Sequence, residues 1–359
     1  MFNFVQRRKR FFTTLLVLLL VSGVAFYIPV PYYITQPGSL IELQPIIKVG
    51  AGGVDKDGSF MLVTVSMLNG NAAYYLYALI SPYADLVRYD RLLGHEETPQ
   101  DYHERQLYVM QNSQDDAILA AFNYASGHLD VSAEAHHAGV RVVRTVPGTP
   151  AEKVLQPGDV ILEADGKEIH SVESLLQLLH ETKLKEVVTF SVQRGEKERQ
   201  VQVALDILPS TDGKEGERSR VGLGIYPVTH RVVSSTPEVT IDTNEIGGPS
   251  AGLMMALEIY NQLHPMDLTK GYRIAGTGTI DPQGKVGQIG SVDHKVAAAD
   301  ARAADLFFVP KDVASHDDNE TVAVQTARKL GTQMNIVPVA TLKDAVDYLH
   351  KLPPAADGT

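Results

Sequence analysis

The sequence predicts an α+β protein with two folded units that differ in their balance of strands and helices. Over residues 306–352, apolar runs typical of strands alternate with amphipathic runs typical of helices, as in domains that pack helices against a sheet. Residues 140–204 contain instead several short strand-like runs separated by turns such as Pro147-Gly148 and Asp165-Gly166. We therefore expect a mixed domain in the C-terminal part of the chain and a smaller, strand-rich domain before it.

The N-terminus has the composition of a membrane anchor. Residues 7–10 are all basic, and no charged residue follows over 11–41. A helix over residues 11–30 would be about 30 Å long, which matches the hydrocarbon thickness of a bilayer. A basic cluster stays on the cytoplasmic side of a single span, so that everything after the span should lie outside the cell.

We therefore expect a cytoplasmic N-terminus at 1–10 and a single-pass transmembrane anchor at 11–33, in contact with the lipid bilayer and ending in an aromatic belt. The alternative is a cleaved signal peptide, because Gly23-Val24-Ala25 offers a pair of small residues at a suitable spacing.

Composition excludes several classes of function. The chain of 359 residues has a net charge of −11 and no cysteine. The negative charge argues against a nucleic acid partner, and the lack of cysteine excludes disulfides, thiolate catalysis and zinc–thiolate sites. The histidines form no H-E-x-x-H pattern, and no G-x-x-x-x-G-K-[ST] phosphate loop occurs. We expect no metal, no nucleotide and no other cofactor.

The most specific chemical signal is the run Gly248–Gly252, Gly-Pro-Ser-Ala-Gly, which precedes a strongly apolar helix. Pro249 suits the first position of a helix, and Ser250 should then lie in the first turn beside free backbone N–H groups. We expect the backbone of Gly248, Ser250 and Ala251 to bind the oxyanion of an acyl-transfer intermediate. Taken alone, the run is also ordinary helix-start chemistry.

Lys295 could activate that serine as a general base. Ser291 is a plausible N-cap for a helix over 292–304, which places Lys295 in its first turns. The helix dipole there disfavours an ammonium, and the flanking Val292 and Val296 indicate burial. Both effects lower the pKa of a lysine towards neutrality, as a general base requires. Taken alone, Lys295 would be an ordinary solvated helix lysine.

G-x-S-x-G is also the nucleophile elbow of α/β-hydrolases. An elbow needs a strand that runs directly into the serine, whereas here the strand-like residues 238–241 are separated from Ser250 by a polar stretch and two glycines. A Ser–His esterase remains the alternative enzyme, with His294 as the first candidate for the base.

Four segments of the C-terminal part carry motifs that are recognisable together: Gly247–Gly252, Ala275–Ile280, Gly284–Lys295 and Phe308–Pro310. Together they resemble the proteolytic domain of Lon proteases. The resemblance implies that Ser250 is the nucleophile, that Lys295 is its partner and that Thr277 orients the lysine. Gly247 stands where Lon commonly has an aspartate, and Ser291 replaces the second glycine before the lysine. Because the phosphate loop is absent, the resemblance does not extend to the ATPase of Lon.

Residues 131–208 resemble a PDZ domain of the kind attached to bacterial secreted proteases. Their order is a strand, a Pro-Gly turn, a short helix, a Gly-Asp turn, further strands and one longer helix. The resemblance implies that a peptide adds as a strand to the sheet edge, with its carboxylate held by a loop at Ala138, Gly139 and Val140. That loop departs from the Gly-Leu-Gly pattern of the family, and a rigid spacer without a ligand is the alternative.

The stretch before this module resembles the first half of the Lon proteolytic domain, with a strand at 58–66 and a helix at 109–122. We therefore expect the PDZ module to be inserted in a discontinuous protease domain formed by 40–130 and 210–350, followed by a tail at 351–359.

As a whole, the chain resembles membrane-anchored Lon-like proteases with a PDZ domain from Gram-positive-type bacteria. The resemblance implies an ATP-independent serine endopeptidase with a Ser–Lys dyad at the bacterial cell surface, which cleaves secreted or membrane-associated peptides and proteins. The PDZ domain would recruit substrate or regulate cleavage. The alternative of another class is a non-catalytic, membrane-anchored PDZ scaffold.

Overall fold

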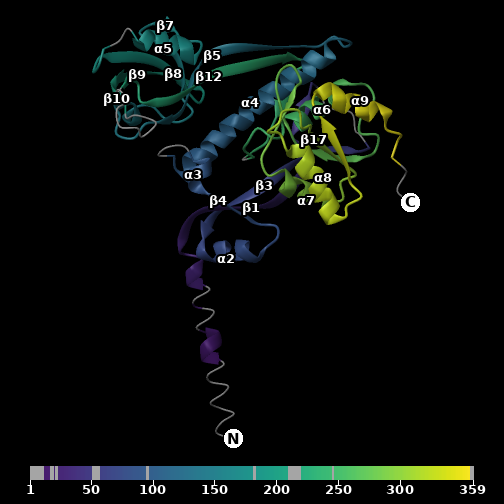
Figure 1. Ribbon diagram of the computed structural model, residues 1–359. Helices are drawn as coiled ribbons and strands as arrows, with labels where there is room; N and C mark the ends of the chain where they lie inside the picture. Colours follow the sequence, from purple (N-terminus) through teal and green to yellow (C-terminus); the bar gives the residue numbers. More distant parts are fainter. Residues whose placement is uncertain are drawn as a thin grey trace, which may run out of the picture.

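The computed structural model contains a body built on a large sheet, a strand-rich domain beside it, and an N-terminal segment that leaves the opposite end of the body (Figure 1). The predicted cytoplasmic segment 1–10 lies outside the described residues, as does part of the predicted anchor. No helix in the described part of the chain combines the length and the apolar character needed to cross a membrane. The described residues are 12–16, 20, 23–50, 57–93, 97–180, 183–208, 220–244 and 246–355.

The sheet of the body joins segments from both sides of the strand-rich domain. Its strand order is β18-β17-β14-β3-β1-β4, and β14 runs parallel to both β3 and β17. Strands β1 and β4 add antiparallel pairs at one end. Residues before the strand-rich domain therefore share one sheet with residues after it. The strands are β1 (Pro29–Glu42), β3 (Ser59–Asn71), β4 (Asp85–Arg88), β14 (Arg273–Gly276), β17 (Leu306–Pro310) and β18 (Asn335–Val339).

Helices cover both faces of this sheet because its central strands carry apolar side chains on both faces. In β3, Phe60 and Leu62 belong to the core beneath α4, α6 and α9, whereas Met61 and Val63 belong to the core beneath α7 and α8. Side chains alternate between the two faces of a strand. The result is a three-layered body with mixed helix and strand content. The helices are α4 (Pro99–Ala125), α6 (Gly252–Leu263), α7 (Val292–Asp300), α8 (Asn319–Leu330) and α9 (Leu342–Lys351).

The strand-rich domain has its own sheet, of order β12-β5-β6-β8-β9, and its own core beneath α5. Strands β5 and β12 pair antiparallel from Ser132 and Thr236 up to Thr145 and Ile225, and this long ribbon connects the domain to the body. Because β12 forms the edge of the sheet, the domain extends past the predicted boundary at 208. Its parts are β5 (Ser132–Thr145), the 3-10 helix η1 (Pro150–Lys153), β6 (Val160–Ala164), β7 (Lys167–Glu168), α5 (Val172–His180), β8 (Val187–Arg194), β9 (Lys197–Ala204) and β12 (Ile225–Thr236).

The predicted anchor cannot extend to residue 33, because residues 29–33 are the start of β1. Tyr33 is 5% exposed, and its ring packs against Tyr89 and Tyr102. The tyrosines that indicated an interfacial belt therefore belong in part to the folded body. The sequence missed the strand because the residues of β3 with which it pairs lie about forty residues further along the chain.

The remaining secondary structure consists of short segments at the edges of the two units. A helix, α2, follows β3 directly, and β2 pairs with β13 and is hydrogen-bonded to Gln262 near the end of α6. These segments are α2 (Ala72–Ile80), α3 (Tyr89–Leu92), β2 (Ile47–Val49), β10 (Asp206–Leu208), β11 (Arg220–Gly222), β13 (Val239–Ile241), β15 (Thr279–Ile280) and β16 (Val286–Gly287).

Candidate active site

Ser250 lies in a turn just before α6, and not in the first turn of the helix as the sequence predicts. The helix begins at Gly252, with Ala251 at its N-cap position. The carbonyl of Ser250 accepts hydrogen bonds from the N–H of Gly278 at 2.9 Å and from the Oγ1 of Thr277 at 3.0 Å. These tertiary bonds occupy the carbonyl and set the conformation of the turn. Pro249 therefore precedes the helix instead of opening it.

Helix α4 holds the other side of the serine turn. The hydroxyl of Ser113 donates to the carbonyl of Pro249 at 3.0 Å, and the N–H of Gly248 donates to the carbonyl of Gln106 at 2.8 Å. The Gly248 N–H is therefore already paired, which corrects its predicted role as an oxyanion donor. Among the described residues, no carbonyl accepts from the N–H groups of Ser250 or Ala251.

Ser113 and Gln106 are positioning residues to which the sequence assigned no role, although Ser113 belongs to the Met-Gln-x-Ser-x-x-x-Ala pattern of the helix at 109–122. Ser113 is 4% exposed and lies on the face of α4 that also carries the buried Met110 and Ala117. A small polar residue at helical spacing within an apolar face was the signal that could have identified it. Close packing is required here, since a Cβ on Gly252 would lie 2.9 Å from the Ser113 hydroxyl.

Lys295 points at the serine from the first turn of α7. Its Nζ lies 2.5 Å from the Oγ of Ser250 and 2.9 Å from the Oγ1 of Thr277. The side chain is 3% exposed, and burial lowers the pKa of Lys295 from 10.5 to about 7. No ion pair joins Lys295 to a carboxylate in the described part of the chain. A buried amine without a counter-charge loses its proton readily, because the charged form is the one that burial penalises.

The turn before α7 differs from an ordinary helix cap. Ser291 occupies the predicted N-cap position, but its φ is +55° and its side chain makes no capping hydrogen bond. The loop is held instead by Asn319 of α8, which accepts from the N–H of Ile289 and donates to its carbonyl. The helix also ends at Asp300, before the predicted limit at 304.

Thr277 contacts both members of the candidate pair. It is fully buried, and its N–H donates to the carbonyl of Phe308 at 2.9 Å. Its hydroxyl donates to the carbonyl of Ser250 and receives a hydrogen bond from Lys295. Thr277 therefore couples the position of the amine to the turn that carries the serine.

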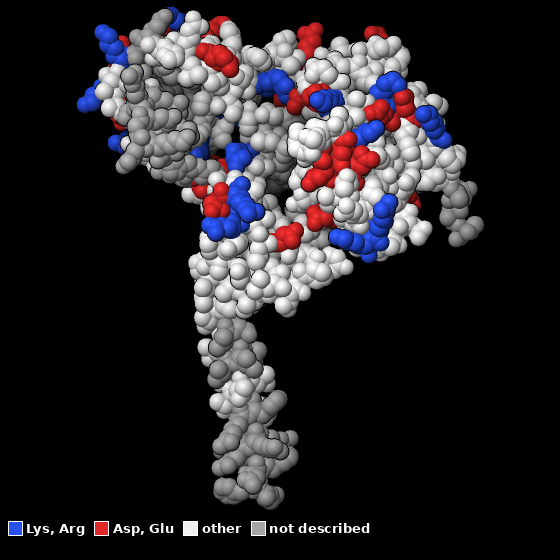
Figure 2. Space-filling model, viewed as in Figure 1, with Lys and Arg blue, Asp and Glu red and all other residues white. Residues whose placement is uncertain are grey.

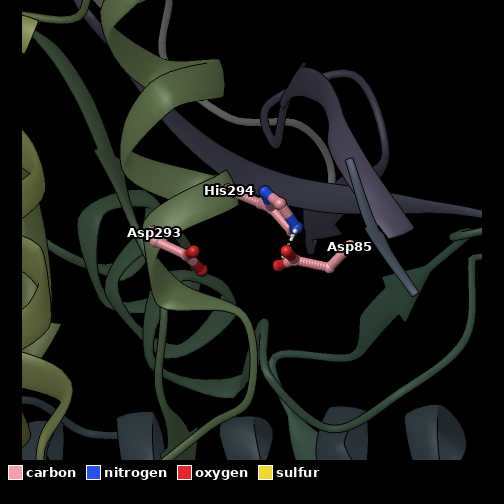
Figure 3. Close-up of side chains that lie close together, drawn as sticks. All are labelled: Asp85, Asp293 and His294. Atoms are coloured by element: carbon pink, nitrogen blue, oxygen red, sulfur yellow. Dashed lines mark ion pairs between the residues drawn. The ribbon is translucent and has the colours of Figure 1, made fainter. Parts of the chain in front are cut away.

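His294, the alternative base, points away from the serine. Its Nε2 lies 3.1 Å from the Oδ2 of Asp85 on β4, and Asp293 lies beside them (Figure 3). Neighbouring residues of a helix point about 100° apart, so His294 and Lys295 face different surroundings. Within the described residues, these three side chains also lie close enough to one another to bind a metal ion jointly. In the structure, the Asp85–His294 pair joins β4 to α7.

The serine and the lysine line a cavity of about 770 Å³. One wall is β3, where Val63, Thr64, Val65 and Met67 line the cavity. The pairing of β3 with β14 ends at Leu62, so among the described residues no strand occupies this edge of β3 beyond that point. An extended polypeptide could pair with the free edge and pass in front of Ser250.

The predicted carboxylate-binding loop of the strand-rich domain is wrong. Residues 138–140 lie inside β5, where Val140 pairs with Thr229 on one side and Ile161 on the other. An apolar groove of about 240 Å³ lies instead between α5 and the start of β12, and its lining includes residues 222–225. These residues are Gly-Leu-Gly-Ile, so the Gly-Leu-Gly pattern was present in the sequence at a later position.

Comparisons with known proteins recognise two parts of the chain. Residues 235–351 match the Lon protease (S16) C-terminal proteolytic domain, and residues 127–205 match the PDZ domain family. The chain is 30% identical over 104 residues to the Lon protease of Mesomycoplasma hyopneumoniae, which covers 29% of this chain and 11% of that protein. The chain therefore spans only about a tenth of the length of that relative.

Solved structures of two bacterial proteins are similar to about a quarter of the chain. The crystal structure of the PDZ domain of the SdrC-like protein from Listeria monocytogenes is 28% identical, with coverage of 26% of this chain and 90% of that chain and a TM-score of 0.22. A solution structure from Geobacillus thermodenitrificans is 26% identical, with coverage of 24% and 94% and a TM-score of 0.21. The family matches show that this chain contains a Lon-type peptidase domain and a PDZ domain.

Proposed function

We propose that this protein is a serine endopeptidase in which Ser250 is the nucleophile and Lys295 is the general base. The observation that carries the proposal is a buried amine 2.5 Å from a serine hydroxyl, with a pKa lowered to about 7 by burial. A lysine can take the proton of a serine only in its neutral form, and a pKa near the working pH supplies that form.

The chemistry follows from these positions. Neutral Lys295 accepts the proton of the Ser250 hydroxyl as Oγ attacks the carbonyl carbon of the scissile peptide bond. The N–H groups of Ser250 and Ala251, which donate to no carbonyl of the described residues, stabilise the oxyanion. The ammonium of Lys295 then protonates the leaving amine, and an acyl-enzyme forms. A water molecule, deprotonated by the same lysine, hydrolyses the ester and restores Ser250. Thr277 accepts a hydrogen bond from the Lys295 amine and keeps it oriented toward Ser250 during both steps.

The substrate is an extended segment of a peptide or protein. The free edge of β3 beyond Leu62 offers backbone hydrogen bonds to such a segment, and side chains of the cavity contact alternate residues. The PDZ domain recruits the substrate or regulates its cleavage. The groove between α5 and β12 is the binding site for a second peptide segment. Cleavage in this proposal needs no ATP, and the test therefore omits the nucleotide.

The protein is anchored at the cell membrane by a single span, with its N-terminus in the cytoplasm and its peptidase domain outside. The support for this location is the basic cluster at 7–10 followed by the charge-free stretch 11–41. A shorter anchor that ends at residue 28 is compatible with β1, which begins at Pro29.

The test is cleavage of fluorescent casein by the full chain in detergent micelles, without ATP, as the wild type and as Ser250→Ala and Lys295→Ala. Both variants should fold, by circular dichroism, and should cleave no substrate. Cleavage by Lys295→Ala would reassign the base and revive the Ser–His esterase. A folded wild type that cleaves nothing and does not react with a fluorophosphonate at Ser250 would favour the non-catalytic scaffold.

A further inference from the structure

Helix α2 presents a large apolar surface that no other part of the described chain covers. Leu76 and Leu79 are each 60% exposed and Ile80 is 83% exposed, while Tyr77 and Tyr83 are about half exposed. No charged residue occurs from Gly58 to Ala84. Soluble proteins rarely expose a contiguous group of large apolar side chains, and such groups mark interaction surfaces.

This surface is fixed to the point where the N-terminal segment leaves the body. The N–H of Ala72 at the start of α2 donates to the carbonyl of Ile28 at 2.9 Å. The ring of Phe26 packs edge-on against Tyr74, with the ring centroids 5.8 Å apart. Residues 26–28 therefore lie against α2, so that a surface that contacts these residues also reaches the helix.

The apolar surface continues onto the N-terminal segment itself. Phe26, Tyr27 and Ile28 are 50–88% exposed, and Leu16 and Leu20 before them are also exposed. In Figure 2 the end of the body around this segment shows no blue or red atoms, whereas charged side chains are spread over the rest of that face. The combined surface offers no charge to a protein partner, and its tyrosines are the residues that favour the boundary of a bilayer.

We infer that α2 lies on the outer surface of the lipid bilayer, with Leu76, Leu79 and Ile80 in the interfacial region beside the anchor. This inference rests on the proposed membrane anchor, because the anchor is what brings α2 to the lipid. The helix acts as a second contact that fixes the orientation of the body, because a single span leaves the body free to tilt and rotate on the membrane.

The orientation has a consequence for the choice of substrate. Strand β3 leads directly into α2, and Met67, which lines the active-site cavity, precedes the helix by about 17 Å of extended chain. The cavity is therefore held close to the membrane surface. Polypeptide segments that emerge from the bilayer are the substrates that reach it most readily.

The experiment uses the full chain, which has no cysteine of its own, so that one introduced cysteine carries an environment-sensitive fluorophore. The three variants are Leu16→Cys in the N-terminal segment, Ile80→Cys on α2, and the control Val187→Cys on β8, which is 54% exposed. Each is reconstituted in vesicles of phosphatidylcholine and phosphatidylglycerol, with and without lipids spin-labelled near the headgroup. All three positions are exposed, so that the substitutions leave the packing unchanged.

We expect the fluorophores at positions 16 and 80 to shift to shorter wavelength, and the one at position 80 to be quenched by the spin-labelled lipids. The fluorophore at position 187 should show neither change. A lipid signal at 16 without one at 80 would overturn the inference while the anchor stands, whereas no signal at either position would overturn both. A shift at 80 that spin-labelled lipids do not quench, and that grows with protein density, would assign α2 to a second copy of the chain instead.

Discussion

The candidate active site and the interface between α4 and the β5–β12 ribbon both bury charged groups, but only one of them supplies a counter-charge. At the active site, Lys295 is buried without a carboxylate, and its pKa falls to about 7. At the interface, Arg231 contacts Asp116 at 2.9 Å and Asp115 at 3.6 Å. Burial there raises the pKa of Asp115 to about 6, although Arg231 opposes that rise.

The difference separates a reactive site from a docking surface. An amine without a counter-charge is costly to protonate, so that it stays available as a base at neutral pH. At the interface, the hydrogen bond and ion pairs of Arg231 with the two carboxylates fix the position of the ribbon on α4 instead. Two further contacts hold the interface together. The hydroxyl of Tyr108 donates to the carbonyl of Thr229, and the guanidinium of Arg141 lies 5.7 Å from the Tyr108 ring centroid.

Helix α4 belongs to both regions through two of its faces. Gln106 and Ser113 contact the serine turn, whereas Tyr108, Asp115 and Asp116 contact the ribbon. Residues seven apart share one face of a helix, whereas residues two apart point about 200° apart, so Gln106 and Ser113 lie on the face opposite Tyr108 and Asp115. The comparison between the two regions can therefore be tested on one helix.

The largest effect should come from replacing Lys295, the buried amine that has no counter-charge. Lys295→Met keeps the volume and removes the amine, so peptide cleavage should fall by at least about 10³-fold, because the nucleophile loses its base. The free energy of unfolding, measured by urea denaturation, should rise because a buried amine no longer loses its hydration. Lys295→Arg should lose both activity and stability, since a guanidinium stays charged. The control is Lys285→Met at an exposed position, and a loss of stability in Lys295→Met would contradict the account.

The pH dependence should follow the lowered pKa of Lys295. Below about pH 7 the amine is protonated, so kcat/KM should fall about tenfold per pH unit there and level off above it. Between about 7 and 10.5 the unfolded lysine binds a proton that the folded one does not. Stability should therefore rise with pH in that window by up to about 1.4 kcal/mol per pH unit, relative to Lys295→Met. An activity profile that is flat from pH 5 to 9 would remove Lys295 as the base.

A smaller effect should come from the face of α4 that holds the serine turn. Ser113→Ala removes the hydrogen bond to the carbonyl of Pro249, which should cost about 1 kcal/mol of stability. It should lower kcat about tenfold with little change in KM, because the turn loses its alignment while the substrate wall on β3 is untouched. The control is Ser126→Ala, which removes a similar bond to a carbonyl at the end of the same helix. Equal kinetics for the two variants would show that Ser113 does not position the turn.

The sequence was most informative where spacing and chemistry act together. The motifs that suggested Ser250, Thr277 and Lys295 depend on side chains that must meet, and in the structure these three lie within hydrogen-bonding distance of one another. The start of α6 was predicted wrongly because local helix-start signals at Pro249 are overridden by bonds to Gly278, which lies in a different segment. Such bonds leave no trace in the local pattern.

The predicted carboxylate loop and the end of the anchor failed for a related reason. Residues 138–140 contain a glycine and indicated a loop, yet they lie within β5, where Val140 pairs on both sides, and a Cβ on Gly139 would lie 2.5 Å from the carbonyl oxygen of Ile161. The glycine serves close packing there. Residues 29–33 looked like the aromatic end of a span because their strand partner is remote in sequence. In both places the missing information was the neighbouring strand.

The smallest effect should come from the compensated charges at the interface. Arg231→Gln breaks the pair with Asp116 and the bond to the carbonyl of Asn112, which should weaken the docking of the ribbon on α4 by about 1–3 kcal/mol. Spin labels on single cysteines in α4 and β8 should then show a broader distribution of distances. The control is Arg88→Gln, whose exposed pair with Asp90 should contribute little.

Cleavage of a short peptide by Arg231→Gln should change less than about threefold, because the opposite face of α4 still holds the serine turn. If its kcat instead falls as far as that of Ser113→Ala, the two faces of α4 do not act independently. The docking of the PDZ domain would then change the position of Ser250 through α4. In that case the ion pairs of Arg231 at the interface would affect the activity of the Ser250–Lys295 pair.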